Sequence, residues 1–224
     1  MTNVNYGMTV PISTVDDLGH ASIVLFFRGC TLNCWYCHNK ELNKDSNIID
    51  IEQLKRDIKA SSLYVSSVTF SGGEPTLQCN VIKELIPYIK TLGLEVCVYT
   101  SGAYPDLLKE IVHGIDRCYI DIKTESAMIT FDYKQYLKNV MRTFSILEDA
   151  KVGTFVTMVA FDTTEDTIDE IDTFKYFLGD KHFTVIQGIC GTGAVRVMPD
   201  EMKASFTDCY IRTKENGVEW NGST

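Results

Sequence analysis

The sequence lacks the features that would place the protein in a membrane, outside the cell or on a nucleic acid. It has no apolar run that approaches the roughly 20 residues of a membrane-spanning helix. Its first residues, MTNVNYGMTVPISTV, have no positive charge followed by an apolar core, as a signal peptide requires. It has no surplus of positive charge, because its 21 Lys and Arg face 30 Asp and Glu, for a formal net charge of −9. We therefore expect a cytoplasmic protein with no membrane and no nucleic acid as partner.

Blocks of like charge and low-complexity tracts are also missing, so no linker or tail divides the chain. Its 224 residues suit one domain with a substantial core, and 45% hydrophobic and 23% charged residues are ordinary for a soluble globular protein. We expect a single domain over residues 1–224, with a core over about 20–190 and a C-terminal extension over about 191–224.

Cysteine, by contrast, is abundant, with eight residues. In a chain expected in the cytosol, cysteines indicate metal or redox work rather than disulfides. Three of them, Cys30, Cys34 and Cys37, form a C-x3-C-x2-C run inside RGCTLNCWYCH, residues 28–38. The other five are scattered, and we interpret most of them as small buried hydrophobic residues: Cys79, Cys97, Cys118, Cys190 and Cys209.

The cysteine run alone allows three interpretations, since thiolates on so short a span can converge on one metal centre. A [4Fe–4S] cluster with three cysteine ligands would leave one iron open, and an open position on a metal usually signals chemistry. A structural zinc site would add His38 to the three cysteines. Residues 34–38 also match the C-x-x-C-H haem attachment pattern. The missing signal peptide weakens the haem interpretation, because that attachment normally takes place outside the cytoplasm.

The apolar pattern predicts strands alternating with helices. We expect six strands of short, β-branched or continuous apolar sequence, at 22–27, 65–70, 94–100, 118–122, 154–160 and 183–187. Apolar residues at helical spacing predict helices near 50–61, 77–89, 107–112, 137–147 and 168–178, and Pro87 should kink or shorten the second of these. Residues up to about Ala21 precede the first strand. The tail should hold one more helix from about Pro199 and a short extended end at 218–220.

This alternation predicts an α/β fold with a parallel sheet and right-handed crossovers. Six units are too few for a closed eight-stranded barrel, so a partial barrel and a doubly wound sheet both remain. In either fold, ligands collect at the carboxyl ends of the strands. The cysteine run follows the first predicted strand, and three further segments end the next three strands: Ser71-Gly72-Gly73-Glu74-Pro75, Thr100-Ser101-Gly102 and Asp121-Ile122-Lys123. We expect these four loops to line one mouth.

The residue types in these loops suit a charged ligand. Gly72 and Gly73 let the backbone come close to a ligand, and Glu74 can accept hydrogen bonds from an ammonium group. Taken alone, such a loop is more often only a tight turn. Asp121 and Lys123 are two residues apart on a strand, so they face the same side. Such a pair is often a solvated rim, but charges inside a buried parallel strand are costly unless a partner or ligand uses them.

Together these residues resemble the radical S-adenosylmethionine superfamily, whose hallmark is C-x3-C-x2-C after the first strand and Gly-Gly-Glu-Pro after the second. The resemblance implies a partial (β/α)6 TIM-like barrel in which Cys30, Cys34 and Cys37 bind one [4Fe–4S] cluster. It implies that the amino and carboxylate groups of S-adenosylmethionine chelate the fourth iron. Tyr36 falls at the position that the family places beside the adenine. Gly72, Gly73 and Glu74 match the loop that holds the methionyl amino group. The zinc and haem interpretations explain none of the later loops.

A narrower resemblance is to the activating enzymes of glycyl-radical proteins, above all those of anaerobic ribonucleotide reductase. It rests on residues 11–16, on Arg28-Gly29-Cys30 and on residues 37–42, CHNKEL. His38 and Asn39 follow the third cysteine as in that group, and the resemblance implies that His38 contacts the cofactor. Asp121 and Lys123 match its second cofactor-contacting segment. Ser101 stands where relatives commonly have asparagine, and we expect it to contact the cofactor as well. This chain departs from the pattern at Leu18 and Lys40, where many relatives carry proline, and in the strand at 155–159, which lacks an arginine often found there.

The resemblance implies an oxidoreductase that works anaerobically. A flavodoxin or ferredoxin would reduce the cluster, and the electron would cleave S-adenosylmethionine into methionine and a 5′-deoxyadenosyl radical. That radical would take a hydrogen atom from a glycine of the partner enzyme. No side-chain acid or base is required, so none is nominated.

Two rivals stay open. One is a radical S-adenosylmethionine enzyme that acts on a small molecule, such as a 7-carboxy-7-deazaguanine synthase, although such enzymes usually lack the Cys-His-Asn sequence. The other is a non-catalytic module that keeps the cluster but not the cofactor. The intact Gly72-Gly73-Glu74 loop and the Asp121/Lys123 pair speak against the module.

Overall fold

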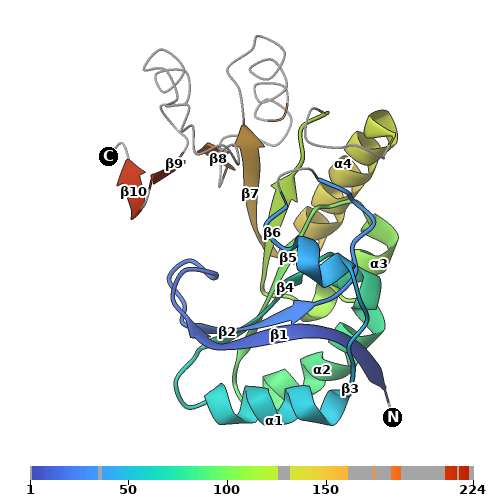
Figure 1. Cartoon of the computed structure of the whole chain (residues 1–224), viewed down its shortest axis with the longest axis vertical. Helices are drawn as coiled ribbons and strands as arrows, with labels where there is room; N and C mark the ends of the chain where they lie inside the picture. Colours follow the sequence, from blue (N-terminus) through green and yellow to red (C-terminus); the bar gives the residue numbers. More distant parts are fainter. Residues whose placement is uncertain are drawn as a thin grey trace.

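The computed structural model describes residues 2–34, 37–125, 132–160, 174, 183–187, 210–215 and 217–221. These residues form one sheet whose strand order is β10-β9-β8-β7-β6-β5-β4-β2-β1-β3 (Figure 1). The sheet is open and mixed, and most of its strand pairs are parallel. It confirms the predicted α/β class.

The parallel part of the sheet contains all six predicted strands. They are β2 (Ser22–Phe27), β4 (Ser67–Gly72), β5 (Glu95–Thr100), β6 (Arg117–Ile122), β7 (Gly153–Ala160) and β8 (Phe183–Gln187). β2 pairs with β4, and each strand in this series then pairs in parallel with the next. Five of the six residues of β2 are buried, as its continuous apolar sequence predicts.

The edges of the sheet correct the prediction. The segment before Ala21 is not merely a lead-in, because it forms β1 (Asn3–Ser13), which pairs antiparallel with β2 and with β3 (Ile48–Asp50). Pro11 is tolerated there because β1 pairs with β3 only over its first residues. At the other edge, β9 (Tyr210–Glu215) was not predicted, and β10 (Gly217–Asn221) contains the predicted extended end.

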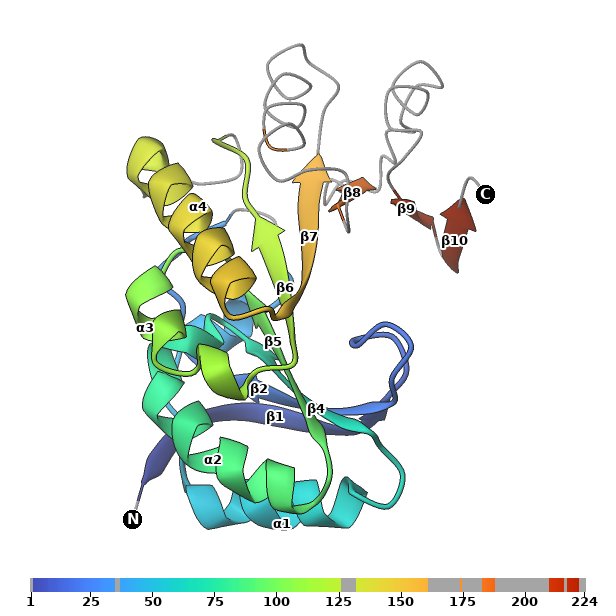
Figure 2. The ribbon, with the colours of Figure 1, turned by 180° about the vertical axis from the view of Figure 1, so that it is seen from behind.

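Helices α1 (Ile51–Ser61), α2 (Cys79–Thr91), α3 (Pro105–Lys109) and α4 (Tyr133–Asp149) cover one face of the sheet (Figures 1 and 2). The side chain of Asp50 caps α1 by accepting the Glu52 N–H, and Asp132 caps α4 in the same way. α2 continues past Pro87 to Thr91, so of the predicted kink or shortening the shortening was wrong. The helix predicted after Pro199 lies outside the described residues, and so does the one at 168–178, apart from Phe174.

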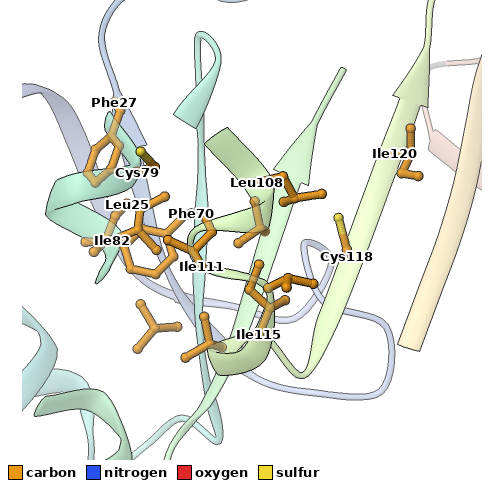
Figure 3. Close-up of a cluster of buried hydrophobic side chains, with 14 of the residues drawn as sticks. Leu25, Phe27, Phe70, Cys79, Ile82, Leu108, Ile111, Ile115, Cys118 and Ile120 are labelled. Atoms are coloured by element: carbon orange, nitrogen blue, oxygen red, sulfur yellow. The ribbon is translucent and has the colours of Figure 1, made fainter. Parts of the chain in front are cut away.

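The core lies between these helices and the sheet (Figure 3). Phe27 and Phe70 meet there with ring centroids 5.7 Å apart. Fully burying a side chain of this size contributes about 1.5–3 kcal/mol, so this layer holds the strand ends firmly in place. Cys79, Cys97 and Cys118 are buried, as expected for small hydrophobic residues, whereas Cys190 and Cys209 lie outside the described residues.

The other face of the sheet carries aromatic and charged side chains. Tyr99, Tyr119 and Phe155 stack across β5, β6 and β7, with successive centroids 4.5 and 4.8 Å apart. At the amino ends of these strands, Asp17 from the β1–β2 connection pairs with Arg117 at 2.8 Å. The turn after β1 is thereby anchored to β6. No helix in the described part of the chain is long and apolar enough to cross a membrane.

Candidate functional site

The four predicted loops begin at the carboxyl ends of neighbouring parallel strands. β2 and β4 are paired so that Phe27 lies opposite Gly72. The cysteine loop and the diglycine loop therefore start side by side. β5 and β6 follow in the sheet and end in Thr100 and Ile122. The sheet order thus brings segments far apart in the sequence to one edge, as expected from the strand pattern.

Arg28 anchors the base of the cysteine loop. Its Nε donates to the Tyr6 carbonyl at 3.0 Å, and its Nη1 donates to the carbonyls of Glu41 and Asp45 at 3.1 Å each. The Gly29 N–H also donates to the Leu42 carbonyl at 3.1 Å. One guanidinium thus folds the segment after the cysteines back onto β1.

The three cysteines of this loop lie close enough together for the charge of one to shift the pKa of another. Burial raises the pKa of Cys30 to about 11, and the charges of Glu74, Cys34 and Cys37 add to the rise. Burial also raises the pKa of Cys34, which the ammonium of Lys123 partly offsets. Cys34 is 6% exposed. Because Glu74 acts on Cys30 and Lys123 acts on Cys34, the cysteine loop lies over the end of β6 as well as beside β4. Because metals bind the thiolate, an iron site here would displace thiol protons.

The donor set fits a cluster better than a single ion. Tetrahedral zinc holds thiolates at about 2.3 Å, so its ligands must converge on one point. In the described part of the chain, no group of three or more His, Cys, Asp or Glu side chains is arranged to hold a metal ion. Cys30, Cys34, Cys37 and His38 therefore do not converge on one point in this structure. The cysteines of an iron–sulfur cluster bind different irons, so they need proximity rather than convergence.

The diglycine loop touches the cysteine loop through its backbone. The Gly73 N–H donates to the Phe27 carbonyl at 2.9 Å, and the Glu74 N–H donates to the Gly29 carbonyl at 2.8 Å. A Cβ at position 73 would lie 2.2 Å from the Gly29 carbonyl oxygen. Gly72 has φ +120, which side-chain-bearing residues rarely adopt. Both glycines are thus required by the approach of the two loops.

Asn39 provides a side-chain link between the same loops. Its Nδ2 donates to the Gly72 carbonyl at 2.9 Å. The backbone carbonyl of Asn39 accepts the Leu42 N–H at 2.9 Å, so both the side chain and the backbone of Asn39 hold the turn after the third cysteine. Asn39 therefore fixes the position of Gly72 relative to the cysteines.

Glu74 is a buried carboxylate, 1% exposed, held entirely by neutral donors. Oε1 accepts from the hydroxyls of Thr76 at 2.6 Å and Thr100 at 2.8 Å, and from the Thr76 N–H at 3.3 Å. Oε2 accepts from the N–H and the hydroxyl of Ser101, at 2.9 and 2.6 Å. The residue thus joins the loop after β4 to the loop after β5. No cation among the described residues pairs with it, so its charge favours a cationic ligand nearby.

Asp121 and Lys123 face the same side of β6, as expected from their spacing. The Lys123 ammonium donates to Asp121 Oδ2 at 2.6 Å. Asp121 Oδ1 is buried and has no hydrogen-bond partner in the described structure. A buried acceptor without a donor is costly, so this oxygen is available to a donor group of a ligand.

The structure brings together most of the predicted site residues. The cysteines, Gly72, Gly73, Glu74, Ser101, Asp121 and Lys123 belong to one set of connected loops. His38 is exposed beside Cys37, and Tyr36 lies outside the described residues. Sequence reasoning missed Tyr136 of α4, whose hydroxyl bonds to the Ser101 carbonyl. A tyrosine next to the apolar stripe of a helix was the only available signal.

Three thiols, a diglycine loop and a buried carboxylate at the carboxyl ends of adjacent strands define an α/β protein with a metal-cluster and ligand site. Residues 24–174, more than half of the chain, match the family model of the radical SAM superfamily. The chain belongs to this superfamily, whose cofactors are a [4Fe–4S] cluster and S-adenosylmethionine. The three neighbouring thiols suit the cluster, and the buried carboxylate of Glu74 suits a cationic ligand such as S-adenosylmethionine.

Two curated relatives differ in their named functions. A Methanocaldococcus jannaschii protein named as a glycyl-radical enzyme activating enzyme is 35% identical over 133 residues, 58% of this chain and 52% of that protein. The match thus spans about half the length of that relative. The 7-carboxy-7-deazaguanine synthase of Thermococcus kodakarensis is 25% identical over 190 residues, 75% of this chain and 74% of the synthase.

The fold also occurs among solved structures. The structure of TYW1 with a lysine–pyruvate adduct bound superimposes with a TM-score of 0.61. It covers 87% of this chain and 76% of TYW1, at 16% sequence identity. At that identity the likeness concerns the fold alone, and it agrees with a partial (β/α) barrel.

Proposed function

We propose that this protein is an activase that cleaves S-adenosylmethionine reductively and takes a hydrogen atom from a glycine of a partner glycyl-radical enzyme. The partner we propose is anaerobic ribonucleotide reductase, with flavodoxin or ferredoxin as the electron donor. The observation that carries the proposal is the 35% identity to the M. jannaschii protein named as an activating enzyme. The Cys-His-Asn sequence at 37–39 supports it, because Asn39 bonds to the diglycine loop.

Each loop has a proposed task. Cys30, Cys34 and Cys37 would hold the cluster. When bound, the cluster supplies the electron that splits S-adenosylmethionine into methionine and a 5′-deoxyadenosyl radical. The backbone at Gly72 and Gly73 would hold the methionyl amino group, and the uncompensated charge of Glu74 would favour that ammonium.

The remaining contacts are proposed for the rest of the cofactor. The unpartnered Oδ1 of Asp121 would accept a hydrogen bond from the cofactor, while Lys123 holds the other carboxylate oxygen in place. Ser101 would shape the wall of the site beside Glu74. Tyr36 would lie along the adenine, and His38 would contact the cofactor beside Cys37. These side chains orient the cofactor and exclude water, so no proton transfer through a side chain is proposed.

A second candidate function is favoured by one observation. The match to the T. kodakarensis synthase covers 74% of that protein, whereas the match to the M. jannaschii protein covers 52%. A radical enzyme that acts on a small molecule is therefore the alternative. The lower identity to the synthase, 25%, places it second.

A partner assay separates the two candidates. The reconstituted, reduced protein is incubated anaerobically with S-adenosylmethionine and the inactive reductase encoded in the same genome. The activase proposal predicts a glycyl-radical signal by electron paramagnetic resonance, which disappears when the partner's glycine is replaced by alanine. A parallel reaction receives the small-molecule substrate of the synthase in place of the reductase. Formation of 7-carboxy-7-deazaguanine there, detected by mass spectrometry, with no radical on any glycyl-radical enzyme of that genome would overturn the activase proposal.

A further inference from the structure

We propose that Tyr136 is a positioning residue whose hydroxyl sets the distance between the loop after β5 and the loop after β6. This inference rests on the proposed roles of Ser101 and Lys123 at the cofactor. Tyr136 lies in the first turns of α4 and is 0% exposed, so it acts on the ligand only through the two loops.

One hydroxyl connects the two loops directly. Tyr136 Oη donates to the Ser101 carbonyl at 2.9 Å and accepts the Lys123 N–H at 2.9 Å. A phenolic hydroxyl has one proton and free lone pairs, so it serves as donor and acceptor at once. Replacing tyrosine by phenylalanine would keep the ring but leave a buried carbonyl and a buried N–H without this partner.

Helix α4 holds three successive carbonyls of the loop after β5. Ser101 is held by Tyr136, Gly102 by Thr143 Oγ1 at 2.9 Å, and Ala103 by Asn139 Nδ2 at 2.9 Å. Of these three side chains, only Tyr136 has a hydrogen bond that continues to the loop after β6. Thr143 and Asn139 secure one loop, whereas Tyr136 couples two.

Tight packing makes this coupling stiff. Gly102 has φ +77, and a Cβ there would lie 3.3 Å from Val140 Cγ2 and 3.5 Å from Val140 Cα. The backbone of α4 thus sits directly on the loop. Because close-packed interiors transmit small displacements, the hydroxyl of Tyr136 cannot release Ser101 without moving the loop.

The coupling reaches the buried carboxylate of the site. The N–H and the hydroxyl of Ser101 donate to Glu74 Oε2, and the carbonyl of Ser101 accepts from the Tyr136 hydroxyl. A continuous path therefore runs from Lys123 through Tyr136 and Ser101 to Glu74. This path fixes the position of Asp121 and Lys123, the proposed cofactor residues at the end of β6, relative to the diglycine loop. Loss of the hydroxyl should weaken cofactor binding more than it slows the reaction of the bound cofactor.

The test compares Tyr136→Phe with two variants of the same helix in the full-length, reconstituted protein. For Tyr136→Phe we expect the KM for S-adenosylmethionine in 5′-deoxyadenosine formation to rise about tenfold, with kcat changed less than about twofold. In Tyr133→Phe, the lost hydroxyl is buried and has no hydrogen-bond partner in the described structure, so KM should stay unchanged and the thermal midpoint should stay the same or rise. Thr143→Val should lower the thermal midpoint about as much as Tyr136→Phe but raise KM less than about twofold.

A purely structural role for Tyr136 gives a different pattern. If Tyr136→Phe and Thr143→Val lower the thermal midpoint alike and change KM alike, the inference is wrong. Equilibrium affinity for S-adenosylmethionine, measured by calorimetry, must show the same split as KM. If the parent protein binds the cofactor without cleaving it, the affinity comparison alone decides the role of Tyr136, and the proposed function fails by itself. If the parent neither binds nor cleaves it, both proposals fall.

Discussion

The side-chain amide of Asn39 donates a hydrogen bond of 2.9 Å to the carbonyl oxygen of Gly72. The turn after the third cysteine is thereby tied to the first glycine of the diglycine loop. Asn39→Asp keeps the shape of the side chain but removes the donor and faces a carboxylate toward the carbonyl. We expect a loss of about 1 kcal/mol in stability and a fall of about fivefold in affinity for S-adenosylmethionine, measured by thermal unfolding and calorimetry.

Asn47 supplies the matched control for Asn39. Its Nδ2 donates to the Tyr6 carbonyl at 3.2 Å, away from the diglycine loop. Asn47→Asp should leave cofactor affinity unchanged. Equal affinity in both variants and the parent would show that the Asn39 link has no part in binding.

Glu74→Gln tests the buried carboxylate. The amide offers one acceptor oxygen where the carboxylate accepts from five donors of Thr76, Thr100 and Ser101. At least one buried N–H or hydroxyl then loses its partner, which costs about 1–3 kcal/mol. The loss of negative charge should also weaken binding of the cationic cofactor. Chemical denaturation and binding isotherms report the two effects, with the exposed Glu110→Gln as the control that should change neither.

The strand pattern predicted the place of the site but not its internal bonds. Each parallel strand is a short apolar run, and the order of such runs determines which loops meet at the carboxyl edge. Asn39 and Gly72 are 33 positions apart, and Glu74 and Ser101 are 27 apart. Periodicity tells which face a residue occupies, but not which distant atom it meets, so these links appear only in the folded structure.

Gly73→Ala probes the contact between the two loops. The new Cβ would lie 2.2 Å from the Gly29 carbonyl oxygen and 2.7 Å from its carbon, so the cysteine loop must move. We expect less iron bound per protein after reconstitution and no detectable affinity for S-adenosylmethionine. Gly93→Ala is the control, because nothing lies within 4 Å of its added Cβ, although its φ of +72 carries strain. Full iron loading and binding by Gly73→Ala would contradict the described contact.

Asp17→Asn tests the anchor at the opposite end of the strands. Asp17 is 0% exposed and accepts from Arg117 Nε and Nη2 at 2.8 Å each, and from the Ser67 hydroxyl at 2.7 Å. Burial alone would lower the pKa of Arg117. Its hydrogen bonds to Asp17 and Glu95 outweigh that effect, so the pKa of Arg117 lies above its ordinary value. Breaking a buried pair costs about 3–5 kcal/mol. Denaturant unfolding should show a loss at the lower end, since Glu95 still pairs with Arg117.

The exposed pair of Arg142 and Asp106 is the control for Asp17. Its N···O distance is 2.7 Å, yet both side chains are exposed, so Asp106→Asn should change stability by less than about 1 kcal/mol. The activity per folded molecule should be the same in both variants, because the anchor lies at the other end of the strands from the cysteines. A stability loss in Asp17→Asn no larger than in Asp106→Asn would contradict the anchoring role.

Sequence reasoning missed the strand β1 and the inward face of helix α4 for identifiable reasons. In β1, the alternation of Val4, Tyr6, Met8, Val10 and Ile12 is a strand signal, but Gly7 and Pro11 point the other way, and edge strands tolerate both. In α4 the predicted stripe was Leu137, Val140, Phe144 and Leu147. The buried residues are Tyr136, Val140, Thr143 and Leu147. Tyr136 and Thr143 turn inward because their hydroxyls satisfy loop carbonyls, which a count of apolar residues does not register.

The most direct test of the account is cofactor cleavage by the reconstituted protein. The chain is loaded anaerobically with iron and sulfide, reduced with dithionite and given S-adenosylmethionine, and 5′-deoxyadenosine and methionine are quantified. We predict that the parent forms both products and that Cys118→Ala, whose lost thiol is buried in the core, forms as much of each as the parent. Cys34→Ala should form neither. Cluster assembly without cleavage, even with candidate partner enzymes present, or equal cleavage by Cys34→Ala, would contradict the central claim.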